Sequence, residues 1–131
     1  MPSPAPKPTE AELAILRVLW NRGPSTVRAV MDAVSVERDM GYTSVLKFLQ
    51  IMLEKGLVKR DEEGRTHVYC AAQPAEQTRR HIVGDLVERA FSGSVSQLVM
   101  HALGHARPDA TDLRAIRRML YELDPPARKK P

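Results

Sequence analysis

Four polar side chains have the residue types and the spacing to read a nucleic acid: Thr43, Ser44, Lys47 and Gln50. Their hydroxyl, amine and amide groups can hydrogen-bond to phosphate oxygens or to the edges of bases. Residues three and four apart share a helix face, and the major groove of B-DNA, about 12 Å wide, admits a helix. The alternative interpretation is that Thr43 only caps the helix and the other three belong to a solvated face. The helices and strands that position the four residues decide between these interpretations.

A second set of cations flanks a charged loop further along the chain. Arg60 and Arg65 are candidate contacts to the phosphate backbone, because neutralising a phosphate releases its bound counterions. The same loop contains Asp61, Glu62 and Glu63, which we expect to point away from DNA. A solvated turn of mixed charge is the alternative interpretation of this loop.

Two pairs of side chains have metal-ligating chemistry, His101 with His105 and His67 with Cys70. Neither pair has a third ligand at a supporting spacing, and residues 67 and 70 would lie on opposite faces of a strand. Cys70 is the only cysteine, which excludes a disulfide within the chain. No Gly-rich phosphate loop or nucleophile motif occurs. We therefore expect no metal site, no cofactor and no enzyme activity.

The first two helices that would support the candidate residues have recognisable ends. Thr9 and Glu12 have the spacing of a capping box, which predicts the start of a first helix. Gly23 and Pro24 end it. Ser25 is the predicted N-cap of a second, shorter helix.

The third predicted helix carries the candidate DNA-binding residues. Thr43 is its predicted N-cap, the helix runs from about residue 44 to 55, and Gly56 supplies the left-handed residue that follows it. Its apolar positions recur at three and four residues, as expected of a buried face: Val45, Leu46, Leu49, Met52 and Leu53.

Two strands follow, predicted over residues 57–60 and 66–71 and joined by a hairpin in which Gly64 takes a positive φ. Three helices followed by a hairpin is the element order of a winged helix. The predicted fold class is therefore mainly α with a small β-hairpin. A winged helix-turn-helix DNA-binding domain occupies residues 9–74, and a C-terminal helical dimerisation segment occupies residues 75–124.

After residue 74 the pattern is helical, over about 76–91 and 95–103, with a last helix capped by Asp109 and Asp112. These helices are too short to form a core of their own, so a second copy of the chain is the expected partner. The predicted dimerisation residues are Ile82, Leu86, Phe91, Leu98, Val99, Leu113, Ile116 and Leu120. The ends, 1–8 and 125–131, are rich in proline and are predicted to be disordered tails.

Composition places few limits on the function. The net charge of +4 is compatible with a polyanionic partner, but it is spread thinly along the chain. No apolar stretch approaches the roughly 18 residues of a membrane span, and the first residues lack the basic and apolar regions of a signal peptide. We expect a cytoplasmic protein without membrane insertion.

Six short motifs, taken in order from about residue 9 to 123, resemble one bacterial family. They are Thr9-Glu10-Ala11-Glu12-Leu13, Val18-Leu19-Trp20, Gly23-Pro24-Ser25-Thr26-Val27-Arg28, Gly41-Tyr42-Thr43-Ser44-Val45, Glu54-Lys55-Gly56-Leu57-Val58 and Ala90-Phe91-Ser92-Gly93-Ser94-Val95-Ser96-Gln97-Leu98-Val99. This ordered set resembles the penicillinase-repressor family of the BlaI/MecI/CopY type. The resemblance implies a homodimeric winged-helix transcriptional repressor that binds an inverted-repeat operator of double-stranded DNA, in settings such as antibiotic resistance.

The resemblance also implies a way of relieving repression. In the β-lactam branch a membrane sensor-protease system triggers cleavage of an Asn-Phe bond in the C-terminal helices. His101 and Ala102 stand at the corresponding place and mark the candidate cleavage region. Lys47 and Ile51 replace residues that are usual in the recognition helix of this family, so the operator sequence cannot be carried over.

Two other classes of function remain open on the sequence. A winged-helix protein-interaction module without sequence-specific DNA binding suits the thinly spread charge and the acidic hairpin. A small-molecule-sensing winged-helix regulator would need a roomy pocket near the dimer helices. A steep salt dependence of duplex binding distinguishes a DNA-binding repressor from the protein-interaction module.

Overall fold

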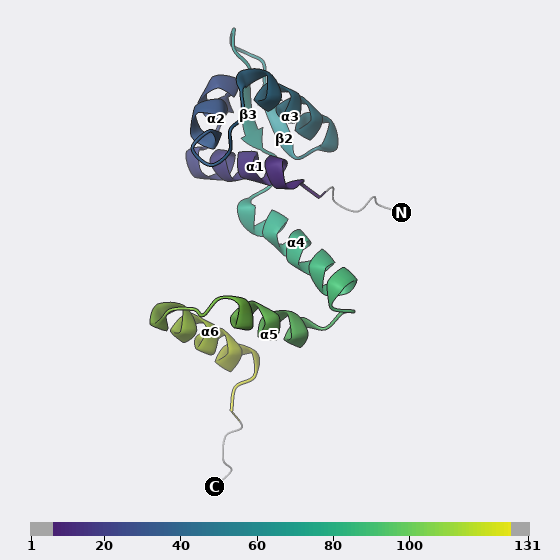
Figure 1. Ribbon diagram of the computed structural model, residues 1–131, viewed down its shortest axis with the longest axis vertical. Helices are drawn as coiled ribbons and strands as arrows, with labels where there is room; N and C mark the ends of the chain where they lie inside the picture. The colour runs from purple at the N-terminus through teal and green to yellow at the C-terminus, as the bar shows by residue number, and fades with distance from the viewer. Residues whose placement is uncertain (1–6, 127–131) are drawn as a thin grey trace. The chain divides into compact units, whose positions relative to one another are not determined.

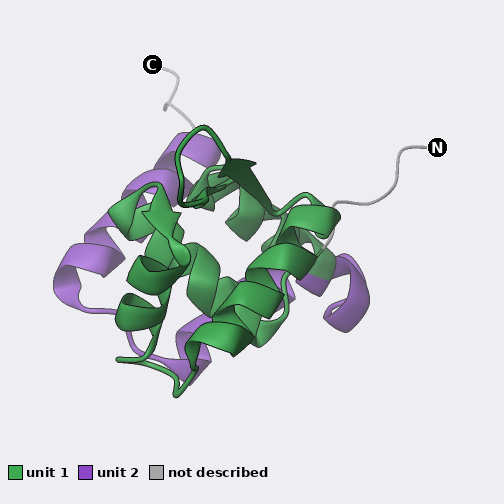
Figure 2. Ribbon diagram, turned by 90° about the horizontal axis from the view of Figure 1, so that it is seen from above, with its two compact units in different colours: residues 1–85 green, residues 86–131 purple. Residues whose placement is uncertain are grey.

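The computed structural model describes residues 7–126, in two compact units that comprise residues 1–85 and 86–131 (Figure 2). The predicted disordered tails fall mostly outside the described residues. The elements, in chain order, are α1 (Glu10–Arg22), β1 (Ser25–Thr26), α2 (Val27–Val34), α3 (Tyr42–Lys55), β2 (Val58–Asp61), β3 (Val68–Ala71), α4 (Ala75–Ala90), α5 (Val95–His105) and α6 (Ala110–Leu123) (Figure 1).

The predicted ends of α1 are confirmed. The backbone N–H of Glu12 donates to Thr9 Oγ1 at 3.2 Å, and the backbone N–H of Thr9 donates to Glu12 Oε1 at 2.8 Å, which completes the capping box. Gly23 caps the other end with a φ of 84°, a conformation that a side chain would strain. The helix is therefore bounded by interactions within its own sequence.

The start of α2 differs from the prediction. Ser25 is not the N-cap; Thr26 is, and its Oγ1 accepts from the backbone N–H of Ala29 at 3.1 Å. Ser25 belongs instead to β1 and pairs with Tyr69 of β3. The sheet thus has three antiparallel strands in the order β1-β3-β2 rather than a hairpin alone. A two-residue strand has no periodicity, so only its distant partner reveals it.

The start of α3 was also predicted wrongly. Gly41, not Thr43, is the N-cap, and the helix begins at Tyr42. Thr43 therefore lies inside the first turn, where its side chain is exposed. At the other end Gly56 takes the left-handed conformation, with φ 81° and ψ 16°, as predicted.

The hairpin that forms the wing joins β2 and β3, with Arg60 opposite Tyr69 and Asp61 opposite Val68. Gly64 does not have the predicted positive φ. The prediction assumed a tight turn, whereas residues 62–67 make a longer connection that does not require this conformation.

One core lies between α1, α2, α3 and the sheet (Figure 1). Its members are the apolar positions that the helical and strand periods direct inward. Nine of them are at most 1% exposed: Ala14, Ile15, Leu16, Val30, Val34, Val45, Leu49, Met52 and Tyr69. With α3 followed by the β2–β3 wing, this unit is a winged helix-turn-helix, and the fold is mainly helical, as the sequence predicts.

The second unit consists of the end of α4 with α5 and α6. Asp109 caps α6 by accepting from the backbone N–H of Asp112 at 2.8 Å, as predicted. α5 extends to His105, two residues further than predicted. Neither α5 nor α6 contains a buried residue within the described chain.

Candidate nucleic-acid interface

The exposed side of α3 carries the four DNA-binding residues that were predicted on this helix. Thr43, Ser44, Lys47 and Gln50 are exposed, whereas the opposite side of the helix is part of the core. At 100° per residue, positions 43, 47 and 50 fall within an arc of about 60°. With a rise of about 1.5 Å per residue they span about 10 Å, or about three base pairs. The structure therefore presents Thr43, Lys47 and Gln50 together as a polar strip, which we call the α3 strip, and Ser44 is exposed beside it.

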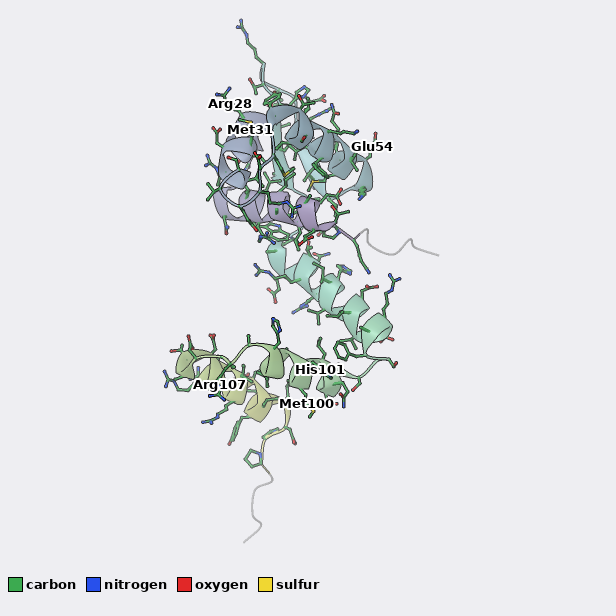
Figure 3. The ribbon with its side chains drawn as sticks, viewed as in Figure 1. Arg28, Met31, Glu54, Met100, His101 and Arg107 are labelled. Atoms are coloured by element: carbon green, nitrogen blue, oxygen red, sulfur yellow. The ribbon has the colours of Figure 1, made fainter. Side chains whose placement is uncertain are left out.

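Glu54 continues the line of the α3 strip toward the C-terminal end of the helix, where it is exposed and points outward (Figure 3). A carboxylate repels the phosphates that flank a groove. The N-terminal two turns of α3 are thus electrostatically suited to DNA, and the last turn is not.

A partly buried ion pair joins the C-terminal end of α3 to α1. Lys55 Nζ lies 2.9 and 3.0 Å from the two carboxylate oxygens of Glu12, whose side chain is 2% exposed. Burial alone would raise the pKa of Glu12, but the hydrogen bond from the Thr9 backbone and the pairing with Lys55 outweigh it, so the pKa is lowered. The carboxylate is therefore ionised at neutral pH and holds the lysine that ends α3.

The two predicted wing cations have different surroundings. Arg65 is exposed in the loop between β2 and β3. Arg60 is partly buried, whereas its neighbours Lys59 and Asp61 on β2 are exposed. It lies opposite Tyr69 and forms a salt bridge with Glu62. Its pKa is raised, first by interaction with the Tyr69 hydroxyl oxygen and second by Glu62.

The interaction between Arg60 and Tyr69 is not a well-directed hydrogen bond. Among the described residues, Arg60 Nε and the Tyr69 hydroxyl are both buried without a well-aligned partner. Arg60 is thus engaged inside the wing, and Arg65 is the more accessible of the two.

Two exposed residues near the starts of α2 and α3 were not predicted as part of the interface. Arg28 lies in the first turn of α2, which packs against α3, and it points away from the core (Figure 3). Tyr42 is the first residue of α3 and is 49% exposed. Assigning the N-cap to Thr43 placed Tyr42 outside the helix, and the correct cap, Gly41, would have drawn attention to it.

The candidate cleavage residues, His101 and Ala102, lie in the middle of α5 (Figure 3). His101 Nδ1 is 2.9 Å from the carbonyl oxygen of Gln97, and its ring centroid is 5.2 Å from that of Phe91. Over residues 7–126, no three His, Cys, Asp or Glu side chains are grouped as metal ligands would be. In the same range no helix is long and apolar enough to cross a membrane.

Residues 8–122 match the family described as Penicillinase repressor, which accounts for most of the chain. The chain belongs to the penicillinase repressor family. Its sequence is also 33% identical over 117 residues to the transcriptional regulator BlaI of two Mycobacterium tuberculosis strains, covering 88% of this chain and 83% of BlaI. These matches confirm the resemblance found from the ordered motifs.

The chain also has more distant similarities. An uncharacterised 16.5 kDa protein of Latilactobacillus sakei is 21% identical over 112 residues, covering 86% of this chain and 77% of that protein. The monomeric form of Bacillus licheniformis BlaI, solved in complex with the blaP half-operator, has a TM-score of 0.49 and 22% identity, covering 55% of this chain and 88% of that one. The family is one of transcriptional repressors.

Proposed function

We propose that this protein is a homodimeric repressor that binds an inverted-repeat operator, with one α3 in the major groove of each half-site. Thr43, Ser44, Lys47 and Gln50 contact bases or nearby phosphates, and Arg65 contacts the backbone from the wing. Arg28 from α2 and Tyr42 from the first position of α3 add further contacts. In the β-lactam systems for which the family is known, such binding blocks transcription.

The observation that carries this proposal is the α3 strip. Thr43, Lys47 and Gln50 are exposed together on one face of a helix whose opposite face packs into the core, and Ser44 is exposed beside them. Lys47 has no carboxylate partner among the salt bridges of the described chain, so its charge is available to a phosphate or to a guanine edge. A fixed helix with a free cation and hydrogen-bonding groups is what major-groove recognition requires.

Dimerisation is supported by the apolar side chains that the second unit leaves exposed. On α6, Leu113 is 36% exposed and Leu120 is 56% exposed, and on α5 Val99 is 39% exposed. At helical spacing, Leu113, Ile116 and Leu120 share one face of α6. An apolar surface of this kind is stabilised when a second copy covers it.

The predicted dimerisation residues of α4 differ in their exposure and surroundings. Ile82 is half-buried and lines a small cavity with Leu57 in the first unit. Leu86, beyond the boundary in α4, is 43% exposed. We therefore base the proposed dimer on α5, α6 and the end of α4.

If repression is relieved by cleavage between His101 and Ala102, α5 has to unwind first. Proteases bind extended substrate, and this bond lies inside a helix whose backbone hydrogen bonds must open for access. A membrane sensor-protease system would be the partner for such a step. Incubating the protein with the protease of such a system and sequencing the new N-terminus would test the site.

The test of the proposed function is selection of bound duplexes from a random pool by the full-length protein, followed by salt titration of binding to the selected duplex. We expect enrichment of an inverted repeat and a steep fall of affinity with salt, because each phosphate contact releases counterions. Sedimentation of the complex should give two chains per duplex. A folded protein that enriches no sequence would instead favour the protein-interaction module.

A further inference from the structure

Trp20, in the last turn of α1, contacts both sides of the junction between the sheet and α4. Its indole N–H donates to the carbonyl oxygen of Gln73 at 3.0 Å. The guanidinium carbon of Arg79 lies 5.9 Å from the centre of the indole ring, which is within the range of a cation–π interaction. Gln73 precedes α4, and Arg79 lies about one turn inside it. We call these three groups the Trp20 clasp.

The junction held by the clasp has little freedom of its own. Residues 72–74 are all that separates β3 from α4. The backbone N–H of Ala72 donates to the carbonyl oxygen of Leu57 at 2.9 Å, which extends the pairing of the sheet. Pro74 fixes its own φ and restricts Gln73. Once Trp20 binds the carbonyl of Gln73, few torsions remain that can redirect α4.

Away from the clasp, contact between α4 and the winged helix is sparse. The half-buried positions of α4 recur at 75, 78, 82 and 85, and Asp85 forms an ion pair with Lys7. Between these ends lies a cavity of about 90 Å³, lined by residues that include Leu57, His81 and Ile82. This volume is below the roughly 300 Å³ of an ordinary small-molecule site. The direction of α4 therefore depends on a few specific contacts rather than on close packing.

We propose that the Trp20 clasp sets the separation of operator half-sites that the dimer accepts, an inference that rests on the proposed function. α4 has 16 residues and is about 24 Å long, and it leads from the DNA-binding unit into the unit proposed to dimerise. A rotation of about 10° at its start displaces its far end by about 4 Å, which exceeds the 3.4 Å step of one base pair. Fixing this angle makes the dimer selective for one spacing.

The test measures affinity of the full-length protein for duplexes in which two selected half-sites are separated in steps of one base pair, and for a single half-site. The variants are Arg79→Met, which keeps the aliphatic stem, and Trp20→Phe, which keeps an aromatic ring without the N–H. The matched control is Arg80→Met, because Arg80 is the next residue on α4, is 79% exposed and pairs with Glu76.

We expect the wild-type protein to prefer one spacing, and both clasp variants to lose about three- to tenfold of that preference, the size of a cation–π contact or a hydrogen bond. Their affinity for a single half-site should equal that of wild type. Arg80→Met should keep the wild-type spacing profile. Arg79→Met should also shift the fluorescence of Trp20, the only tryptophan in the chain.

Clasp variants that keep the full spacing preference would overturn the inference. If Trp20→Phe unfolds the protein, the inference is tested by Arg79→Met alone. Arg79 is exposed, so removing its charge leaves the core intact. Failure of the proposed function has a different signature, since the wild-type protein would then bind no inverted repeat better than random duplex.

Discussion

Replacing Lys55 with methionine is the most informative perturbation of the winged helix, because it leaves the Glu12 carboxylate buried without its cation. In the folded protein this carboxylate accepts from Lys55 Nζ and from the Thr9 backbone N–H, so Lys55→Met removes one of two sources of stabilisation. Breaking a fully buried ion pair costs about 3–5 kcal/mol. Because the Lys55 side chain is 34% exposed, water reaches the site, and we expect a smaller loss of about 2 kcal/mol.

Glu12→Gln tests the contribution of the negative charge separately from that of the capping box. Glutamine at this position preserves the capping-box spacing and removes the negative charge, while Lys55 can rotate into solvent. We expect Glu12→Gln to cost about 1 kcal/mol and the double variant to cost less than the sum of the two single changes. Such non-additivity measures the coupling between the two side chains.

The pH dependence of the same pair has a definite sign. The pKa of Glu12 is lowered below its ordinary value of 4.5, so the pair contributes stability above that value and loses it as pH falls through the folded-state pKa. In Lys55→Met the pairing with the lysine no longer lowers the pKa of Glu12, so this pKa should be higher than in the wild-type protein. Protonation of Glu12 removes the unpaired buried charge from the variant. The difference in free energy of unfolding between wild type and Lys55→Met should therefore become smaller on going from neutral pH to about pH 4.

Urea denaturation followed by circular dichroism at the two pH values measures these differences. The matched control is Arg17→Met, which breaks the exposed pair between Arg17 and Glu37, with side chains 42% and 54% exposed. An exposed pair contributes less than about 1 kcal/mol, so this control should change stability little. The reasoning is refuted if Lys55→Met costs no more than Arg17→Met, or if its cost is independent of pH.

Three further predictions concern DNA binding, assembly and backbone conformation. If Lys47 contacts a base, Lys47→Ala should alter the sequence preference of the protein. If it contacts phosphate, the variant should lose affinity uniformly for all duplexes, and the slope of log affinity against log salt concentration should fall by about 1. Unchanged titrations would show that Lys47 is not part of the interface. Leu120→Glu should shift the sedimentation equilibrium toward monomer, whereas Arg118→Glu on the same helix should not, and equal behaviour of the two would contradict the proposed dimer. Gly56→Ala should cost about 1 kcal/mol in urea denaturation because of its φ of 81°. Gly84→Ala, inside α4, should be neutral or stabilising, and the reverse order would contradict the conformational argument.

Some of the candidate site was predictable because helical spacing decides which residues share a face. The period of apolar residues in α3 placed Val45 and Leu49 in the core, which directs Lys47 and Gln50 outward wherever the helix packs. The DNA-binding roles of these residues stay predictions. Arg60 shows the limit of this reasoning, since nothing in its local sequence reveals that Tyr69 lies opposite it.

The sequence by itself determined the features made by residues three or four apart: the Thr9–Glu12 capping box, the cap at Asp109, and the end of α3 at Gly56. Such contacts close within one helical turn, so residue type and spacing are sufficient to form them.

Only the tertiary structure decided the contacts between residues far apart in the chain. The pairing of Ser25 with Tyr69, the ion pair between Glu12 and Lys55, and the clasp of Trp20 on Gln73 each join residues more than forty positions apart. Each forms only after the core has offset the entropy of closing a long loop, and its partner is chosen by the packing of whole elements rather than by neighbouring residues.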